Sequence, residues 1–223
     1  MVRPNALISA YPNAVAVVGF YRTGTHWLCR LIQEYFGHLI VNRGEGEGFG
    51  SVAPPWGFFH HDILGYMDAP HRAVYLYRDP VDTMFSWSQM VGTWEYTWDN
   101  IRSGAEKYGK HLARWLAPGY AMHLAVMRYE RMREDFPRIC LLANQEVNEG
   151  RLDCIFARAT EERRLTTREH NQRWDFPTGP EYADARAGFR SEHAALVWKT
   201  VLAGREWLQL HFDHLPEEKR WTP

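Results

Sequence analysis

The chain has 223 residues, of which 45% are hydrophobic, enough for a single globular domain over residues 1–223 with a full core. Its net charge of −1 predicts no nucleic-acid partner, and no apolar stretch is long enough for a membrane span. Cys29, Cys140 and Cys154 are too few and too widely spaced for a disulfide framework or a zinc site, so we expect free thiols, no bound metal and a cytoplasmic location.

The most informative segment begins with an apolar, β-branched run over residues 14–20. A polar loop follows over residues 21–25, and apolar residues then recur at helical spacing up to Tyr35. A strand, a tight loop and a helix bind phosphate well, because backbone N–H groups at the helix start point at the anion. Gly24 lets the backbone approach closely, and Arg22 adds a positive charge.

This loop differs from a Walker A motif, in which G-x-x-x-x-G-K is followed by Ser or Thr. Gly19 and Gly24 have the required spacing, but Thr25 and His26 stand where the lysine and the Mg²⁺-binding hydroxyl would be. We therefore expect an anion to be held without that lysine and without Mg²⁺. From this segment alone, a buried strand with an ordinary turn and a helix start is an equally good interpretation.

Strand and helix patterns alternate along the rest of the chain. Strands are predicted over residues 38–42, 73–77 and 122–129, and loops over 43–57 and 165–190. Helices are predicted from Pro80 onward, over 98–116, over 130–147 with a break near Pro137, over 151–164 and over 192–212. This alternation predicts an α/β fold with a mostly parallel sheet. Ligands of such sheets bind at the carboxyl ends of the strands, where the loops after Phe20, Tyr77 and Tyr129 should meet.

A second basic motif follows the strand over residues 73–77. Arg78 leaves the strand end, and Ser86 comes eight residues later, about two helical turns on. A guanidinium and a hydroxyl placed in this way can bind a second phosphate. In the alternative interpretation, Arg78 pairs with Asp79 or Asp82 and Ser86 is an ordinary residue of a helix surface.

Three motifs together resemble the cytosolic-type sulfotransferases. Y-R-T-G-T-H-W-L, from Tyr21, is similar to the family's 5′-phosphosulfate loop, Y-P-K-S-G-T-T-W. Y-R-D-P-V-D-T-M-F-S-W, from Tyr77, is similar to its 3′-phosphate motif, R-N-P-x-D-x-x-x-S. R-Y-E-R-M-R-E-D-F-P, from Arg128, is similar to S-Y-E-D-M-K-x-D-P. The chain resembles a small, bacterial-like member, which implies a three-layer α/β/α, P-loop NTPase-like sulfotransferase fold.

The resemblance implies the cofactor 3′-phosphoadenosine 5′-phosphosulfate (PAPS) and its product 3′-phosphoadenosine 5′-phosphate (PAP). The sulfuryl group would pass to a hydroxyl or amine of a small-molecule acceptor, and a homodimer is left open. Carried over by position, the 5′-phosphosulfate would be held by Arg22, Thr23, Gly24, Thr25 and His26. Trp27 would stack on adenine, Tyr129 would hydrogen-bond the adenine edge, and Arg78 and Ser86 would bind the 3′-phosphate.

The family's C-terminal motif, R-K-G-x-x-G-D-W-K, is only partly present. F-R-S-E-H-A-A-L-V-W-K, from Phe189, keeps an arginine, a tryptophan and a lysine, but both glycines are missing and Trp198 sits one residue late. By position, Arg190 is a further candidate for the 3′-phosphate, whereas the glycine-rich clamp is not carried over.

Sulfuryl transfer requires a base for the acceptor's proton and a cation near the leaving oxygen. The family's base is the His of K-T-H, and this chain has F-F-H-H-D from Phe58. His61 is the candidate base, His60 and His26 are the alternates, and Asp62 is expected to orient the His61 ring. Arg22 replaces the family's loop lysine, and Phe59 replaces the lysine before the histidine. In the alternative interpretation, the two histidines simply lie on a loop surface.

Two other classes of function stay open from the sequence. A noncatalytic nucleotide-binding module of the same fold fits the missing lysine and the altered C-terminal motif. A small-molecule or nucleotide kinase that uses ATP and Mg²⁺ is the third hypothesis, against which the absent Walker lysine argues.

Overall fold

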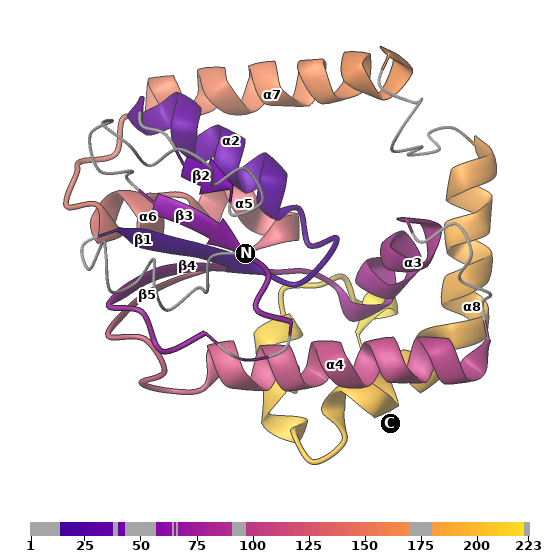
Figure 1. Ribbon diagram of the computed structural model, residues 1–223. Coiled ribbons are helices and arrows are strands. Elements are labelled where there is room, and N and C mark those ends of the chain that lie inside the picture. The colour runs from indigo at the N-terminus through magenta and orange to yellow at the C-terminus, as the bar shows by residue number, and fades with distance from the viewer. Residues whose placement is uncertain are drawn as a thin grey trace. The chain divides into compact units, whose positions relative to one another are not determined.

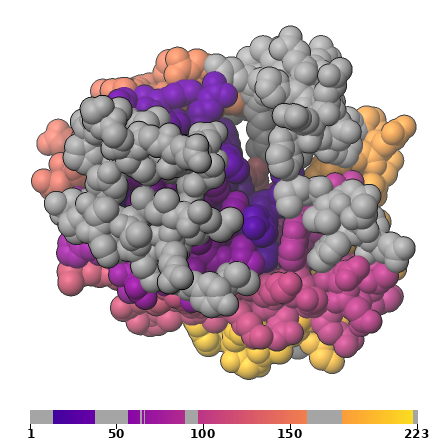
Figure 2. Space-filling view, viewed as in Figure 1, coloured from indigo at the N-terminus to yellow at the C-terminus, as the bar shows by residue number. Residues whose placement is uncertain are grey.

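The structure is a computed structural model that describes residues 14–37, 40–42, 57–63, 65, 67–90, 97–169 and 180–220, drawn in colour in Figure 1; Figure 2 gives the same view in space-filling form. The loop expected over 43–57 falls outside these residues except for its last one. The chain divides into two compact units. The first comprises residues 1–77 and 114–157, and the second comprises 78–113 and 158–223. The single domain expected from the chain length stays a prediction.

The first unit is built on a five-stranded sheet in the order β2-β3-β1-β4-β5, with every neighbouring pair parallel. The strands are β1 (Val15–Gly19), β2 (Ile40–Asn42), β3 (Gly57–His60), β4 (Arg72–Tyr77) and β5 (His123–Arg128). Their common direction places the loops that follow β1, β3, β4 and β5 at one edge of the sheet (Figure 1). The predicted α/β fold with a parallel sheet is confirmed.

Burial explains why β1 and β4 were recognisable in the sequence. All five residues of β1 are buried, and so are all residues of β4 after Arg72. A central parallel strand is covered on both faces, so it consists of consecutive apolar residues. β3 was not predicted, because its apolar part is only Gly57 to Phe59 and it directly follows a segment read as loop.

The helices of the first unit begin and end at recognisable signals. Helix α2 (Thr25–Phe36) lies between Gly24 and Gly37, both in the left-handed conformation that glycine adopts at little cost. The single helix expected over 130–147 is three short pieces: η2 (Tyr129–Arg131), α5 (Met132–Asp135) and α6 (Pro137–Leu142). Pro137 starts α6, so the predicted break is confirmed, but the helix ends at Leu142 rather than Val147.

Two segments of the second unit correct the sequence-based prediction. Residues 165–190 were expected to be loop-rich, yet α7 (Glu149–Glu169) extends past residue 164 and α8 (Pro180–Leu202) begins at Pro180. These segments are helical despite a polar composition that carries little apolar periodicity. The helix expected up to Phe212 ends at Leu202. Gly204, at a φ of 68°, then leads into the 3-10 helix η3 (Glu206–Phe212).

The other elements of the second unit lie where they were predicted. α3 (Pro80–Met90) begins with proline at its first position, and α4 (Trp98–Leu116) has the predicted bounds. α3 packs beside α8 (Figure 1), and a short 3-10 helix, η4 (Glu217–Lys219), lies near the end of the described chain. Among the described residues, no helix combines the length and the apolar character needed to cross a bilayer.

Candidate nucleotide site and catalytic histidine

The loop between β1 and α2 has the backbone form expected of an anion-binding turn. Arg22 and Gly24 both adopt positive φ angles, 67° and 91°, so the chain turns sharply before the first helical N–H groups. The hydroxyls of Thr23 and Thr25 point inward: Thr23 Oγ1 donates to the Phe20 carbonyl at 2.8 Å and lies 3.2 Å from Thr25 Oγ1. Both threonine side chains are buried, so they hold the loop from within.

Gly24 is needed for close packing as well as for its backbone angle. A Cβ atom at this position would lie 2.5 Å from the Tyr129 ring. The loop after β1 and the residue after β5 are therefore in direct contact, as their positions at one sheet edge predicted. This contact connects two of the three motifs within the first unit.

Next to this contact, the Trp27 ring of α2 packs against two other aromatic rings. The Trp27 ring lies 5.9 Å from the Tyr129 ring and 6.1 Å from the Phe156 ring of α7, both edge to face. All three side chains are only partly buried, which leaves aromatic surface for a flat ligand. Phe156 was missed by the sequence analysis because no motif marks it.

His61 has a defined tautomer. Its Nδ1 lies 2.8 Å from the Gly19 carbonyl oxygen, which can only accept, so Nδ1 carries the proton and Nε2 is the basic nitrogen. Burial lowers the pKa of His61 to about 4, with the Gly19 hydrogen bond opposing that shift and the nearby His26 and His60 adding to it. At neutral pH the ring is therefore uncharged.

The two alternate histidines differ from His61 in their surroundings. His60 Nδ1 accepts the Asp62 backbone N–H at 2.8 Å, so its neutral ring carries the proton on Nε2. His26 is exposed, and its ring lies 6.2 Å from that of His61. Partial desolvation and the charge of Arg22 lower the pKa of His26.

Asp62 does not orient His61 as expected, because Gly19 takes that role and the carboxylate bonds elsewhere. Its oxygens accept the Met67 N–H at 2.9 Å and the Trp115 indole N–H at 3.1 Å, and Arg114 lies 3.6 Å away. Asp62 is buried, at a φ of 48°. It thus fixes the segment that follows His61.

Arg114 secures the same segment from another direction. Its guanidinium donates to the carbonyl oxygens of Gly65 and Met67, and its Nε donates to the Tyr120 hydroxyl at 2.7 Å. Tyr120 in turn donates to the Met67 carbonyl at 2.7 Å. The connection between β3 and β4 is therefore held at several backbone atoms, although its described residues form no regular structure.

In the second unit, Arg78 is anchored by its backbone. The buried Tyr108 of α4 donates its hydroxyl to the Arg78 carbonyl at 2.8 Å and accepts the Arg78 N–H at 3.0 Å. Ser86, the other residue expected at the 3′-phosphate, is buried on α3. Tyr108 was missed because nothing in its sequence context distinguishes it from a core tyrosine.

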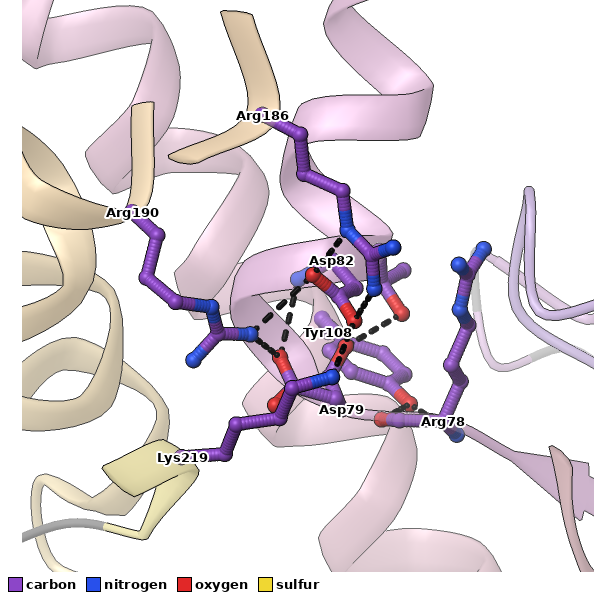
Figure 3. A network of polar contacts seen from close by, with 8 residues as sticks. Arg78, Asp79, Asp82, Tyr108, Arg186, Arg190 and Lys219 are labelled. Carbon is purple, nitrogen blue, oxygen red and sulfur yellow. Dashed lines mark hydrogen bonds and ion pairs between the residues drawn. The ribbon is translucent and has the colours of Figure 1, made fainter. Parts of the chain in front are cut away.

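Asp79 and Asp82, at the start of α3, contact cations that come from later in the chain. Arg190 Nη2 donates to Asp79 at 2.7 Å and to Asp82 at 3.1 Å (Figure 3). Arg186 binds Asp82 through two nitrogens, Nε at 2.8 Å and Nη2, and Lys219 Nζ lies 3.5 Å from Asp82. Asp79 Oδ1 also accepts the Asp82 N–H at 2.8 Å and so caps the helix.

The pKa values of Asp79 and Asp82 shift in opposite directions. Burial and the charge of Asp82 raise the pKa of Asp79, more than Arg190 lowers it. Burial alone would also raise the pKa of Asp82, but the Arg186 hydrogen bonds and the charges of Arg78, Arg186 and Arg190 hold it well below its usual range. Asp82 is thus a firmly ionised centre among cations.

The described residues contain no group of three or more His, Cys, Asp or Glu side chains able to hold a metal ion.

Two comparisons with known proteins bear on the fold. The structure is similar to that of mouse sulfotransferase SULT7A1 complexed with PAP, with a TM-score of 0.61 at 14% identity, over 91% of this chain and 90% of that chain. This likeness defines a sulfotransferase fold. Residues 60–146 match the family model described as the sulfotransferase domain. The two findings agree with the resemblance to sulfotransferases that the motifs indicated. No curated protein sequence matches the chain.

Proposed function

We propose that this protein is a PAPS-dependent sulfotransferase with His61 as its general base and a small-molecule hydroxyl or amine as acceptor. The observation that carries the proposal is the tautomer of His61. Gly19, directly before the phosphate-type loop, accepts the Nδ1 proton, which leaves Nε2 to receive a proton. The sulfotransferase domain match and the fold support the reaction class.

The base assignment follows from comparing the three histidines. In His60, the basic Nδ1 of the neutral ring already accepts the Asp62 N–H. His26 has an exposed ring beside Arg22, without an acceptor that fixes its tautomer among the described residues. His61 has a tautomer that is fixed by Gly19, directly before the loop, and a lowered pKa that keeps its ring neutral at pH 7.

The residues present fit the nucleotide. When bound, PAPS supplies the sulfuryl group, and the reaction forms an acceptor O–S or N–S bond as the bond from sulfur to the bridging oxygen breaks. His61 Nε2 takes the acceptor's proton. The backbone of residues 22–26 and the Arg22 guanidinium stabilise the charge that develops on the leaving oxygen.

The residues proposed to bind adenine and the 3′-phosphate are those that the resemblance implies, with one addition. Trp27 and Tyr129 would contact adenine, and Phe156 joins them because its ring meets the Trp27 ring edge to face. Arg78, Ser86 and Arg190 would bind the 3′-phosphate. Phe59 is buried where the family has a lysine, so Arg22 is left as the cation of the loop.

A transfer assay with four single histidine variants, one of them a control, tests the proposal. Labelled sulfate is followed from PAPS to a panel of phenols, alcohols and amines. We expect His61→Ala to abolish transfer while PAP binding stays nearly unchanged. The exposed His123→Ala serves as the matched control. Loss of transfer in His60→Ala or His26→Ala, with His61→Ala active, would refute the base assignment.

The same assay separates the other functions. Tight PAP binding without transfer to any acceptor would indicate a noncatalytic module, for which the buried Phe59 in place of lysine is the supporting observation. Magnesium-dependent ATP turnover would indicate a kinase instead.

A further inference from the structure

The start of α3 carries a cluster with more positive than negative charge. Arg186, Arg190 and Lys219 surround Asp82, and Arg190 also contacts Asp79 (Figure 3). Both carboxyl groups are buried, whereas the side chains of the three cations are 36%, 20% and 28% exposed, in that order. Negative charge therefore lies inside the cluster and positive charge faces outward.

The arginines use only part of their hydrogen-bonding capacity on the carboxylates. Arg190 contacts both aspartates through Nη2, and among the described residues its Nε and Nη1 have no partner. Figure 3 shows Nη1 of Arg190 directed away from Asp79 and Asp82. A guanidinium that is held through one nitrogen, with its other two nitrogens available, is suited to bidentate contact with a phosphate.

We infer that Asp82 is a positioning residue for phosphate recognition, and that Arg186 and Lys219 join Arg190 in a site for the phosphate monoester of the nucleotide. This inference rests on the proposed function, because the phosphate is taken to be the 3′-phosphate of PAPS and PAP. It adds two cations and one carboxylate to the residues that the motifs suggest.

The positioning role follows from the repulsion among the cations. Arg186, Arg190 and Lys219 all approach one carboxylate, so without its charge they would repel one another and separate. Asp82 is itself fixed, because its N–H is bonded to Asp79 at the start of α3. The helix thereby sets the position of side chains that come from α8 and η4.

The test compares PAP with adenosine 5′-monophosphate, which lacks the 3′-phosphate, by calorimetric titration of the full chain. The wild type should bind PAP about 100-fold more tightly than the monophosphate, as expected for several charge-assisted hydrogen bonds. Lys219→Met and Arg186→Met should each reduce this ratio about 5- to 10-fold, while affinity for the monophosphate stays constant. Lys110→Met, an exposed lysine paired with Glu106 on α4, is the matched control and should leave the ratio unchanged.

The direction in which Asp82→Asn changes PAP binding distinguishes a positioning role of Asp82 from an effect of its charge alone. Removing a negative charge would tighten PAP binding if charge alone mattered. A positioning role predicts the reverse, a fall of about 10-fold in the ratio, because the cations separate. Thermal unfolding shows whether Asp82→Asn is folded. If it is not, the Lys219→Met result tests the inference.

The outcomes separate this inference from the proposed function. If the wild type binds neither nucleotide, the proposed function fails and this inference fails with it. If the wild type prefers PAP but Lys219→Met and Arg186→Met keep the full ratio, only this inference is overturned. Tighter PAP binding in Asp82→Asn would overturn the positioning role.

Discussion

The hydroxyl of Tyr108 makes two hydrogen bonds to the backbone of Arg78, at 2.8 Å to its carbonyl and 3.0 Å from its amide. Arg78 is the first residue after β4, so it has left the sheet ladder and needs other partners for its peptide groups. One buried phenol on α4 satisfies both. It therefore determines where the arginine side chain begins.

Tyr108→Phe should weaken PAP binding more than adenosine 5′-monophosphate binding. The change leaves two backbone groups without their partner and costs about 1–3 kcal/mol of stability. We expect the PAP preference to fall several-fold because Arg78 is less well placed. Tyr35→Phe removes a buried hydroxyl that accepts the Asn148 N–H, so it should lower stability without changing the preference. If Tyr108→Phe and Tyr35→Phe show the same ratio of PAP affinity to monophosphate affinity, a role for Tyr108 in placing Arg78 is contradicted.

Gly24→Ala should abolish nucleotide binding. The backbone at residue 24 has a φ of 91°, and the added Cβ would lie 2.5 Å from the Tyr129 ring. Strain and overlap together cost about 2–4 kcal/mol, and the loop must move to relieve them. Gly119, also at positive φ, is the control: an added Cβ there meets no atom within 4 Å, so Gly119→Ala carries the strain without the overlap. Near-normal PAP affinity in Gly24→Ala would show that the close packing is dispensable.

The pH dependence of transfer should reflect the lowered pKa of His61. The neutral ring is the base, and it predominates above the folded-state pKa of about 4. The rate should therefore stay nearly constant from about pH 7.5 down to about pH 5 and fall only as the pH approaches 4. Measuring kcat/KM against pH for one acceptor checks this. A midpoint near the ordinary histidine value of 6.5 would contradict the assignment.

Asp62→Ala should destabilise the segment after His61 and reduce transfer. It leaves the Trp115 indole and the Met67 N–H without their acceptor and Arg114 without its ion pair, a loss of about 2–4 kcal/mol. Asp62→Asn keeps an acceptor oxygen and tolerates the positive φ, so its loss should be smaller. Urea unfolding and transfer rates measure both effects. If Asp62→Asn is as damaging as Asp62→Ala, the charge matters more than the hydrogen bonds.

The sequence predicted the elements whose own residues encode them. β1 and β4 are uninterrupted apolar runs, and α3 and α4 begin or end at proline, glycine or charged signals. The helix α8 was misplaced because residues 180–190 are polar and carry little periodicity. Its position depends on packing against α3, which no local pattern reveals.

The candidate site was predictable only where a motif marks it. His61 and Arg78 lie in motifs, but the carbonyl of Gly19 that orients His61 is 42 residues away in the chain. Likewise, Asp82 meets Arg186 across 104 residues, whereas the sequence suggested only Arg78, in the alternative interpretation, as a partner of Asp79 or Asp82. Contacts of this kind follow from the fold as a whole rather than from local spacing.

The most direct test of the proposed PAPS site is calorimetric titration of the wild-type chain with PAP in the absence of Mg²⁺. We predict a dissociation constant of about 1 µM or tighter, equivalent to about −8 kcal/mol, with His61→Ala binding equally well. Absence of binding up to about 1 mM PAP, or binding that requires Mg²⁺, would contradict this site.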